Sequence, residues 1–127
     1  MITFSWDWAY TMRVLPVLLD AAMVTLKATA VGTVIAVFLG LAFALLRRSS
    51  NMLVSRPVAF FVEFIRSTPL LVQIYFVYYI FPEFGLKMTP FLTGVIALGL
   101  HFSSYMSEVY RAGIEGIPRG QWEAGIS

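Results

Sequence analysis

The sequence predicts an all-α, polytopic membrane protein, and three observations carry this prediction. Of the 127 residues, 59% are hydrophobic and only 13% are charged. A soluble domain usually carries about 25% charged residues, because its surface faces water. The mean hydropathy is +0.80, and the apolar residues gather in segments long enough to cross a lipid bilayer. We therefore expect several helices of this chain to lie in a membrane.

Residue counts exclude several kinds of site. The sequence has no cysteine and one histidine, so disulfides, thiol catalysis and cysteine-ligated metal centres are excluded. A single histidine also argues against a metal centre built from protein ligands alone. We expect no catalytic residue, no bound metal or cofactor, and no nucleic-acid partner. The net charge of +2 is less informative than the positions of the basic residues, which determine orientation in membranes.

The first membrane span is predicted at residues 24–46. Its centre, Ala28–Leu46, is a run of 19 residues without charge. At about 1.5 Å per residue this run extends roughly 28 Å, close to the ~30 Å thickness of a hydrocarbon core. A signal peptide would lie nearer the N-terminus and follow a basic cluster. Neither condition is met, so the sequence favours a membrane span.

The same span carries a regular pattern of small residues. Ala28, Gly32, Ala36, Gly40 and Ala44 recur every four residues. Small side chains at this spacing form a groove that allows another helix to approach closely. We therefore predict that the first span packs against a neighbouring helix along this stripe, although the pattern does not identify the neighbour.

The second span is predicted at residues 58–81, and it is interrupted. Glu63 and Arg66 are charged, so its uninterrupted apolar part is shorter, Leu70–Phe81. Pro69 has no N–H to donate to the carbonyl four residues earlier. The sequence therefore predicts that this span begins as a short cytoplasmic-side segment and kinks at the proline. Backbone groups freed by such a kink must be covered by protein or water.

The third span is predicted at residues 89–110, and one of its faces is polar. At about 100° per residue, His101, Ser104, Tyr105 and Glu108 fall on the same side of this helix. A charged side chain at the bilayer centre costs at least ~2.5 kcal/mol on insertion scales. Polar residues within a span are therefore expected to face protein or water rather than lipid.

Two interpretations of these polar residues compete. For the charged residues near the inner membrane edge we favour ion pairs between helices; they are Glu63, Arg66, Glu108 and Arg111. Three polar residues lie deeper in the spans: Gln73, His101 and Ser104. For these, hydrogen bonds between helices and a path for a small zwitterionic solute are equally supported.

Basic residues predict the orientation. They concentrate in the connection between the first two spans and after the third span, at Arg47, Arg48, Arg56, Arg111 and Arg119. The positive-inside rule places both segments in the cytoplasm, and the N-terminus then lies outside.

Aromatic residues mark the expected outer interface. Trp6, Trp8 and Tyr10 would form an aromatic belt at the headgroup level. Residues Met12–Ala22 are predicted to form an interfacial helix, which Pro16 weakens.

The C-terminal segment, residues 115–127, is predicted to form a short amphipathic helix on the cytoplasmic side. Pro118 ends the third helix and suits the first turn of a new one. Glu123 lies near the new N-terminus, where the helix dipole favours a negative charge. Trp122 and Ile126 are four residues apart and share a face. This face has two physically reasonable partners, the membrane surface or a groove in another protein.

The same segment resembles a known family. "RAGIEGIPRGQWEAGIS" is similar to the cytoplasmic signature loop of permease subunits in binding-protein-dependent ABC importers, which reads Glu-Ala-Ala, three residues, then Gly. Glu123 and Ala124 match its first two positions, Gly125 replaces the second Ala, and the expected Gly falls two residues beyond Ser127. The preceding Gly120-Gln121 pair resembles polar amino acid uptake permeases. The resemblance implies that this segment couples to an ATPase subunit through Gly120, Gln121, Trp122, Glu123, Ala124 and Ile126.

A second motif points to the same subfamily. "FIRSTPLLVQIYFVYY" resembles its Arg-Gly-Thr-Pro-Leu-Leu-Val-Gln signature, with Ser67 in place of Gly. The residues carrying this match are Arg66, Thr68, Pro69 and Gln73. Within the subfamily, "LHFSSYMSEVYRAGI" followed by "PRGQWEAG" looks most like permeases for ectoine and hydroxyectoine uptake.

The resemblance implies a fold, a location and partners. The fold is that of type I ABC importer permeases in the bacterial inner membrane, and residues 1–127 would form its N-terminal part. Family members usually have five or more spans, so three predicted spans imply a C-terminally shortened chain. The implied partners are an ATP-binding subunit, a solute-binding protein, a second permease subunit, the same or homologous, and membrane lipid.

The implied function is ATP-driven import of a polar amino acid or a related zwitterionic solute such as ectoine. The sequence has no Gly-rich phosphate loop followed by Lys-Ser/Thr, so ATP hydrolysis is expected in the separate subunit. The alternative is a membrane scaffold or assembly subunit with no solute path. That alternative accounts for the spans and the small-residue stripe, but it leaves both motifs unexplained.

Overall fold

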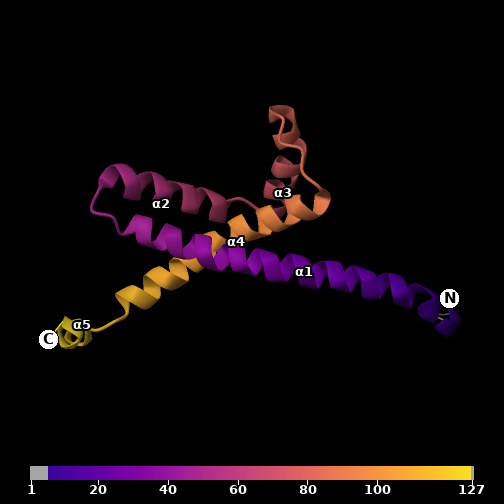
Figure 1. Ribbon diagram of the computed structural model, residues 1–127, viewed down its shortest axis with the longest axis horizontal. Coiled ribbons are helices and arrows are strands. Elements are labelled where there is room, and N and C mark those ends of the chain that lie inside the picture. The colour runs from indigo at the N-terminus through magenta and orange to yellow at the C-terminus, as the bar shows by residue number, and fades with distance from the viewer. Residues whose placement is uncertain (1–5, 127) are drawn as a thin grey trace, which may run out of the picture.

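The computed structural model describes residues 6–126, although only the backbone is described at Arg119, Trp122, Glu123 and Ile126. Its elements, in chain order, are α1 (Trp8–Arg47), α2 (Met52–Ser67), α3 (Leu70–Tyr79), the 3₁₀ helix η1 (Phe81–Phe84), α4 (Pro90–Glu115) and α5 (Arg119–Ile126) (Figure 1). No strand occurs in this described part of the chain, so the predicted all-α class is confirmed.

Helix α1 begins earlier than predicted. It starts at Trp8, where the Asp7 carboxylate accepts a hydrogen bond from the Tyr10 N–H at 3.0 Å, and it runs unbroken for 40 residues. The predicted separate interfacial helix at 12–22 is therefore wrong, because Pro16 lies inside one continuous helix. Proline removes one hydrogen bond, and that single loss does not interrupt the apolar helix on either side.

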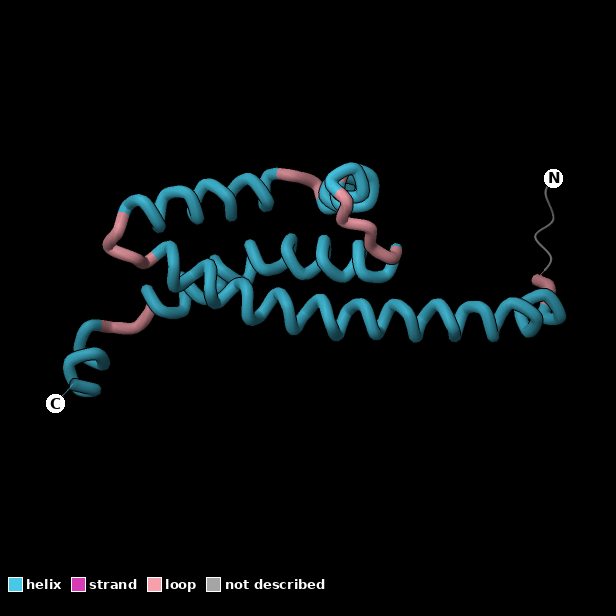
Figure 2. Tube along the Cα trace, turned by 45° about the horizontal axis from the view of Figure 1, so that its top comes forward, coloured by secondary structure: helices cyan, strands magenta, loops and turns pink. Residues whose placement is uncertain are grey.

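Three charged residues in the N-terminal half of α1 made this half look unlike a membrane helix in the sequence. Arg13, Asp20 and Lys27 are seven residues apart. A seven-residue step returns to nearly the same side of an α-helix, so all three charges follow one narrow strip and the rest of the surface stays apolar. α1 extends about 60 Å, roughly twice the thickness of a hydrocarbon core. Figure 2 shows it running most of the length of the molecule, with the start of α1 and the helix α5 at opposite ends.

The small-residue stripe of α1 packs against α4. Gly32, Ala36, Gly40 and Ala44 are buried, whereas Ala28, at the N-terminal end of the stripe, is half-buried. The predicted helix contact is thus confirmed, and α4 is the neighbour.

The contacts of two glycines fix the direction of this packing. A Cβ atom on Gly32 would lie 3.5 Å from the Leu98 Cβ, and one on Gly40 would lie 2.6 Å from the Met106 Cβ. Because both positions advance together along the two helices, α1 and α4 run parallel. Parallel neighbours place Arg47 and the C-terminal part of α4 at the same end of the molecule (Figure 1).

α4 presents a matching stripe that the sequence analysis missed. Val95, Gly99, Ser103 and Ser107 are all buried and recur every four residues. A Cβ atom on Gly99 would come within 2.5 Å of the Ile35 Cγ2, so only glycine allows the side chain of α1 to approach this closely. The same spacing that identified the stripe on α1 could have identified this one.

The predicted interruption of the second span is confirmed, but it is a full break rather than a kink. α2 ends at Ser67, α3 begins at Leu70, and the two helices are bent by 103° at the break. α3 then packs on α4. A tight turn with Gly85 at φ +82° follows η1, and the Thr89 hydroxyl caps α4 by accepting from the Leu92 N–H at 3.2 Å.

Among the described helices, α1 is long and apolar enough to cross a membrane by itself, and α2 with α3 passes the same test as one bent pair. Such a pair is either a broken span or a re-entrant loop. α4 is long enough, but its C-terminal half contains His101, three serines and Glu108. These polar residues explain why α4 does not pass by composition.

Candidate functional site

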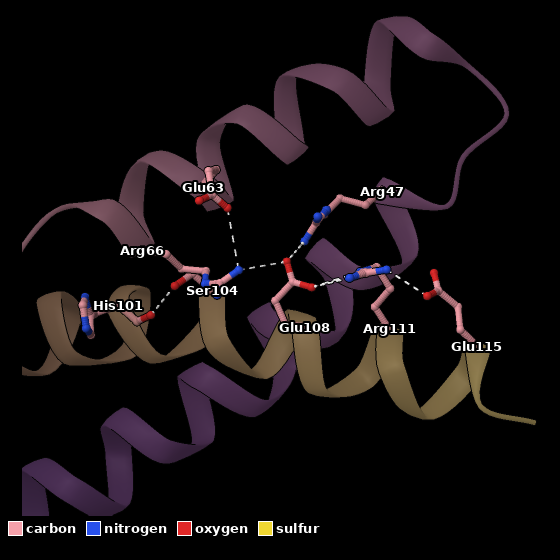
Figure 3. A network of polar contacts seen from close by, with 8 residues as sticks. All are labelled: Arg47, Glu63, Arg66, His101, Ser104, Glu108, Arg111 and Glu115. Carbon is pink, nitrogen blue, oxygen red and sulfur yellow. Dashed lines mark hydrogen bonds and ion pairs between the residues drawn. The ribbon is translucent and has the colours of Figure 1, made fainter.

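Glu108 is the centre of a charged cluster that joins three helices (Figure 3). Its Oε1 accepts hydrogen bonds from the Nη1 atoms of Arg47 on α1, at 2.6 Å, and of Arg66 on α2, at 3.2 Å. Its Oε2 accepts from the Nε of Arg111, on the next turn of α4, at 3.0 Å. Charge-assisted hydrogen bonds of this kind are stronger than neutral ones. One carboxylate therefore holds the ends of α1 and α2 against α4.

Two further carboxylates complete the cluster. Glu63 lies 3.7 Å from the Nη1 of Arg66, and Glu115 lies 2.8 Å from the Nη1 of Arg111. Three arginines thus face three glutamates, so the cluster is close to neutral. Arg111 lies beyond the predicted span 89–110, and its hydrogen bonds with Glu108 and Glu115 raise the pKa of its guanidinium. This arginine stays charged throughout the physiological pH range.

The predicted ion pairs between Glu63, Arg66, Glu108 and Arg111 are confirmed, but the sequence analysis missed Arg47. Arg47 is one of the more buried members of the cluster, with 17% of its side chain exposed, compared with 22% for Glu108. Its position could have been deduced only from the parallel packing of α1 and α4. That packing places both residues at the same end of the two helices.

The family signature residues form the break between α2 and α3. The Gln73 Nε2 donates to the carbonyls of Ile65, at 2.7 Å, and Thr68, at 3.0 Å. The Thr68 hydroxyl donates to the carbonyl of Phe64 at 2.8 Å. Gln73 is buried, with 8% of its surface exposed. The side-chain amide is therefore engaged with the backbone of the break.

The other two residues predicted for a solute path lie on α4. Ser104 is fully buried, and its hydroxyl donates to the carbonyl of His101 at 2.6 Å. The His101 ring lies 5.2 Å from the Tyr105 ring, and the guanidinium of Arg66 lies over the Tyr105 ring, 5.4 Å from its centroid. His101 Nδ1 is buried without a hydrogen-bond partner within residues 6–126. The Oε1 of Gln73 is likewise buried without a partner in that part of the chain, so His101 and Gln73 each keep one polar atom uncommitted.

A cavity of about 310 Å³ lies elsewhere, between α1 and α4. None of Gln73, His101 and Ser104 lines it. Its lining is almost entirely apolar and consists of Ala28, Thr29, Gly32, Thr33, Ala36, Val37, Leu98, Phe102, Tyr105, Met106 and Val109. Such a lining suits packed side chains better than a zwitterionic solute.

The predicted cytoplasmic helix is present as α5, whose first turn contains a hydrogen bond from the Gln121 N–H to the Pro118 carbonyl at 3.0 Å. Gly120, Gln121 and Ala124 are exposed. The side chains of Trp122, Glu123 and Ile126, which carry the predicted coupling face, lie outside the described part of the structure. Within that described part, no three His, Asp or Glu side chains are grouped closely enough to hold a metal ion.

Comparison with known proteins gives concordant matches. The family model for "Binding-protein-dependent transport system inner membrane component" matches residues 32–126. The chain is 44% identical over 129 residues to the probable amino-acid ABC transporter permease protein y4tG of Sinorhizobium fredii, covering 98% of this chain and 56% of that protein. It is 33% identical over 122 residues to the arginine transport system permease protein ArtQ of Bacillus subtilis, with 95% and 56% covered.

The fold matches a solved structure as well. A chain from the crystal structure of an amino acid ABC transporter with histidines superposes with a TM-score of 0.87 and 35% identity, over 95% of this chain and 56% of that one. The chain therefore spans about half the length of the relatives it matches. Because the family model covers most of the chain, the protein belongs to the family of binding-protein-dependent transport system inner membrane components.

Proposed function

We propose that the chain acts within the permease subunit of an ATP-driven importer that moves a polar amino acid or a related zwitterionic solute into the cell. The observation that carries this proposal is the likeness to an amino acid ABC transporter at a TM-score of 0.87 and 35% identity. Relatives named as amino-acid and arginine permeases support it. ATP hydrolysis takes place in a separate ATP-binding subunit.

The proposed solute is small and zwitterionic, and ectoine remains the finer alternative to an amino acid. His101 is the residue proposed to face the path, since its ring contacts Tyr105 and one ring nitrogen is uncommitted within the described residues. Ser104 and Gln73 direct their donors to backbone carbonyls, which favours structural roles for these donors, although the Gln73 Oε1 is also without a partner among the described residues. Uptake of labelled glutamine and labelled ectoine by cells producing the full importer distinguishes the solutes.

The proposed partners lie on both sides of the membrane. A solute-binding protein delivers the solute from outside, and a second permease subunit, the same or homologous, completes the path. The ATP-binding subunit docks inside against α5, whose predicted apolar face consists of Trp122 and Ile126. With the N-terminus outside, α5 and the Glu108 cluster lie on the cytoplasmic side, so movement of α5 reaches α1 and α2 through Glu108.

The coupling role is tested with the double variant Trp122→Ala/Ile126→Ala in the assembled importer. We expect membrane insertion to persist, while copurification of the ATP-binding subunit is lost and uptake falls at least tenfold. The matched control is Phe84→Ala, which removes an exposed aromatic side chain at η1. Unchanged uptake and unchanged copurification in the double variant would contradict the role of α5. Failure of any ABC ATPase to copurify with the unaltered protein would instead favour the scaffold alternative.

A further inference from the structure

We infer that Gln73 holds the break between α2 and α3 by supplying the hydrogen-bond donor that Pro69 lacks. The role is a positioning one, because the amide acts on the backbone of the break and thereby on the direction of α3. It is independent of the solute carried and can be tested without any measurement of transport.

The backbone carbonyls at the break lose their usual helical donors, which supports this role. In an unbroken helix the N–H of residue 69 would bond to the carbonyl of Ile65, but proline has no N–H. The Thr68 N–H instead turns back to Ile65, at 3.3 Å, which deprives the Phe64 carbonyl of its usual donor. The Thr68 hydroxyl replaces that donor at 2.8 Å. The carbonyl of Thr68, and that of Ile65 with its long 3.3 Å bond, therefore need further donors.

Gln73 provides those donors from the first turn of α3. Its Nε2 carries two hydrogens, and it bonds to two carbonyls, that of Ile65 at 2.7 Å and that of Thr68 at 3.0 Å. Its own backbone N–H bonds to the Pro69 carbonyl at 3.2 Å. Helical side chains lean toward the N-terminus of their helix, so residue 73 reaches back across the break. Asparagine has one methylene less and would not reach as far.

Because Ile65 and Gln73 are buried, loss of these hydrogen bonds would be costly. Ile65 and Gln73 are 6% and 8% exposed, so water does not replace a lost donor at this position. An unsatisfied backbone carbonyl is costly in an apolar environment. Loss of the amide leaves the Ile65 carbonyl with the 3.3 Å bond from the Thr68 N–H alone and removes the side-chain donor of the Thr68 carbonyl, so the break is expected to rearrange.

The break also positions part of the charged cluster. Arg66 lies two residues before Thr68, and its guanidinium contacts both Glu108 and the ring of Tyr105. A change in the direction of the break therefore alters how α2 meets α4. Gln73 thus links a motif in the sequence to the relative placement of three helices.

The variant Gln73→Met tests this inference, since it keeps the length of the side chain and removes both donors. The chain contains no cysteine, so Leu53→Cys and Phe84→Cys, both at strongly exposed positions, introduce one pair of spin labels across the break. We expect Gln73→Met to broaden and lengthen the label-to-label distance. Complete straightening of α2 and α3 would add on the order of 10 Å, given the rise of an α-helix. Val72→Met, at the exposed neighbouring position, is the control and should change nothing.

A second background makes the result decisive. Pro69→Ala restores the missing N–H, so Gln73→Met should have much less effect in that background than in the native one. Accumulation in the membrane provides a parallel readout if Gln73→Met fails to fold alone. In that case the double variant should recover. An unchanged distance in Gln73→Met, or an equal loss in both backgrounds, would overturn the inference.

Discussion

At the scale of single residues, Glu108 connects α4 to two other helices. Its two carboxylate oxygens bind guanidinium groups from α1, α2 and its own helix. With 22% of its side chain exposed, it is partly shielded from solvent, so water compensates only in part for a lost partner. Removing one member of such a pair costs more than the pair contributes, because the remaining charges are left without partners.

We therefore expect Glu108→Gln to lower the free energy of unfolding by about 1–3 kcal/mol. The amide keeps the shape of the side chain but removes the charge that Arg47 and Arg66 bind. Glu63→Gln is the matched control, because Glu63 is 68% exposed and lies 3.7 Å from its partner. It should change stability little. Equilibrium unfolding in detergent micelles measures both values, and equal losses would show that Glu108 is not the centre of the cluster.

At the scale of elements, two complementary stripes hold α1 and α4 together. Glycine is required only where the helices come closest. A Cβ on Gly40 would lie 2.6 Å from the Met106 Cβ and 2.9 Å from the Ser103 carbonyl oxygen, whereas one on Gly32 would lie at an ordinary 3.5 Å from Leu98. The backbone of α1 therefore approaches α4 more closely at Gly40 than at Gly32.

This difference predicts opposite results for one substitution at two positions. Gly40→Ala should destabilise the chain by about 1–3 kcal/mol, because backbone must move to admit the methyl group. Gly32→Ala should be neutral or stabilising by up to ~1 kcal/mol, since alanine favours the helix and fits the space. Thermal unfolding midpoints of the two variants in the same detergent check this. Equal midpoints would mean that the helices pack differently from the structure.

At the scale of the whole molecule, the parallel course of α1 and α4 brings several basic residues to one end. Arg47 is the last residue of α1 and Arg48 follows it, while Arg111 lies in the last turns of α4. The turn around η1 lies away from this end, beyond the break that follows α2 (Figure 1). A concentration of positive residues at one end is typical of a cytoplasmic side.

The orientation is testable because the chain has no cysteine of its own. Single cysteines at Ser50 and Phe84, both exposed, should react differently with a membrane-impermeant maleimide on intact spheroplasts. We expect labelling of Phe84→Cys from outside and labelling of Ser50→Cys only after permeabilisation, because the proposed topology puts the two positions on opposite sides of the bilayer. The reverse pattern would invert the proposed topology, and labelling of both from outside would contradict a span between them.

Local chemistry in the sequence determined much of this protein. Composition established the helical membrane class, the four-residue spacing established the packing face of α1, and Pro69 established the position of the break. Each of these three features depends only on residues that are close together in the sequence.

Tertiary structure alone decided which partner each of these features meets. It matched the stripe of α1 with Gly99 and Ser103 of α4, paired Arg47 with Glu108 across 61 positions of sequence, and turned Gln73 back onto Ile65. These contacts depend on the direction and depth at which helices cross, and no local pattern encodes either. A stripe of small residues or a buried charge in the sequence indicates that a partner is needed. Only the packing of the helices determines which residue is that partner.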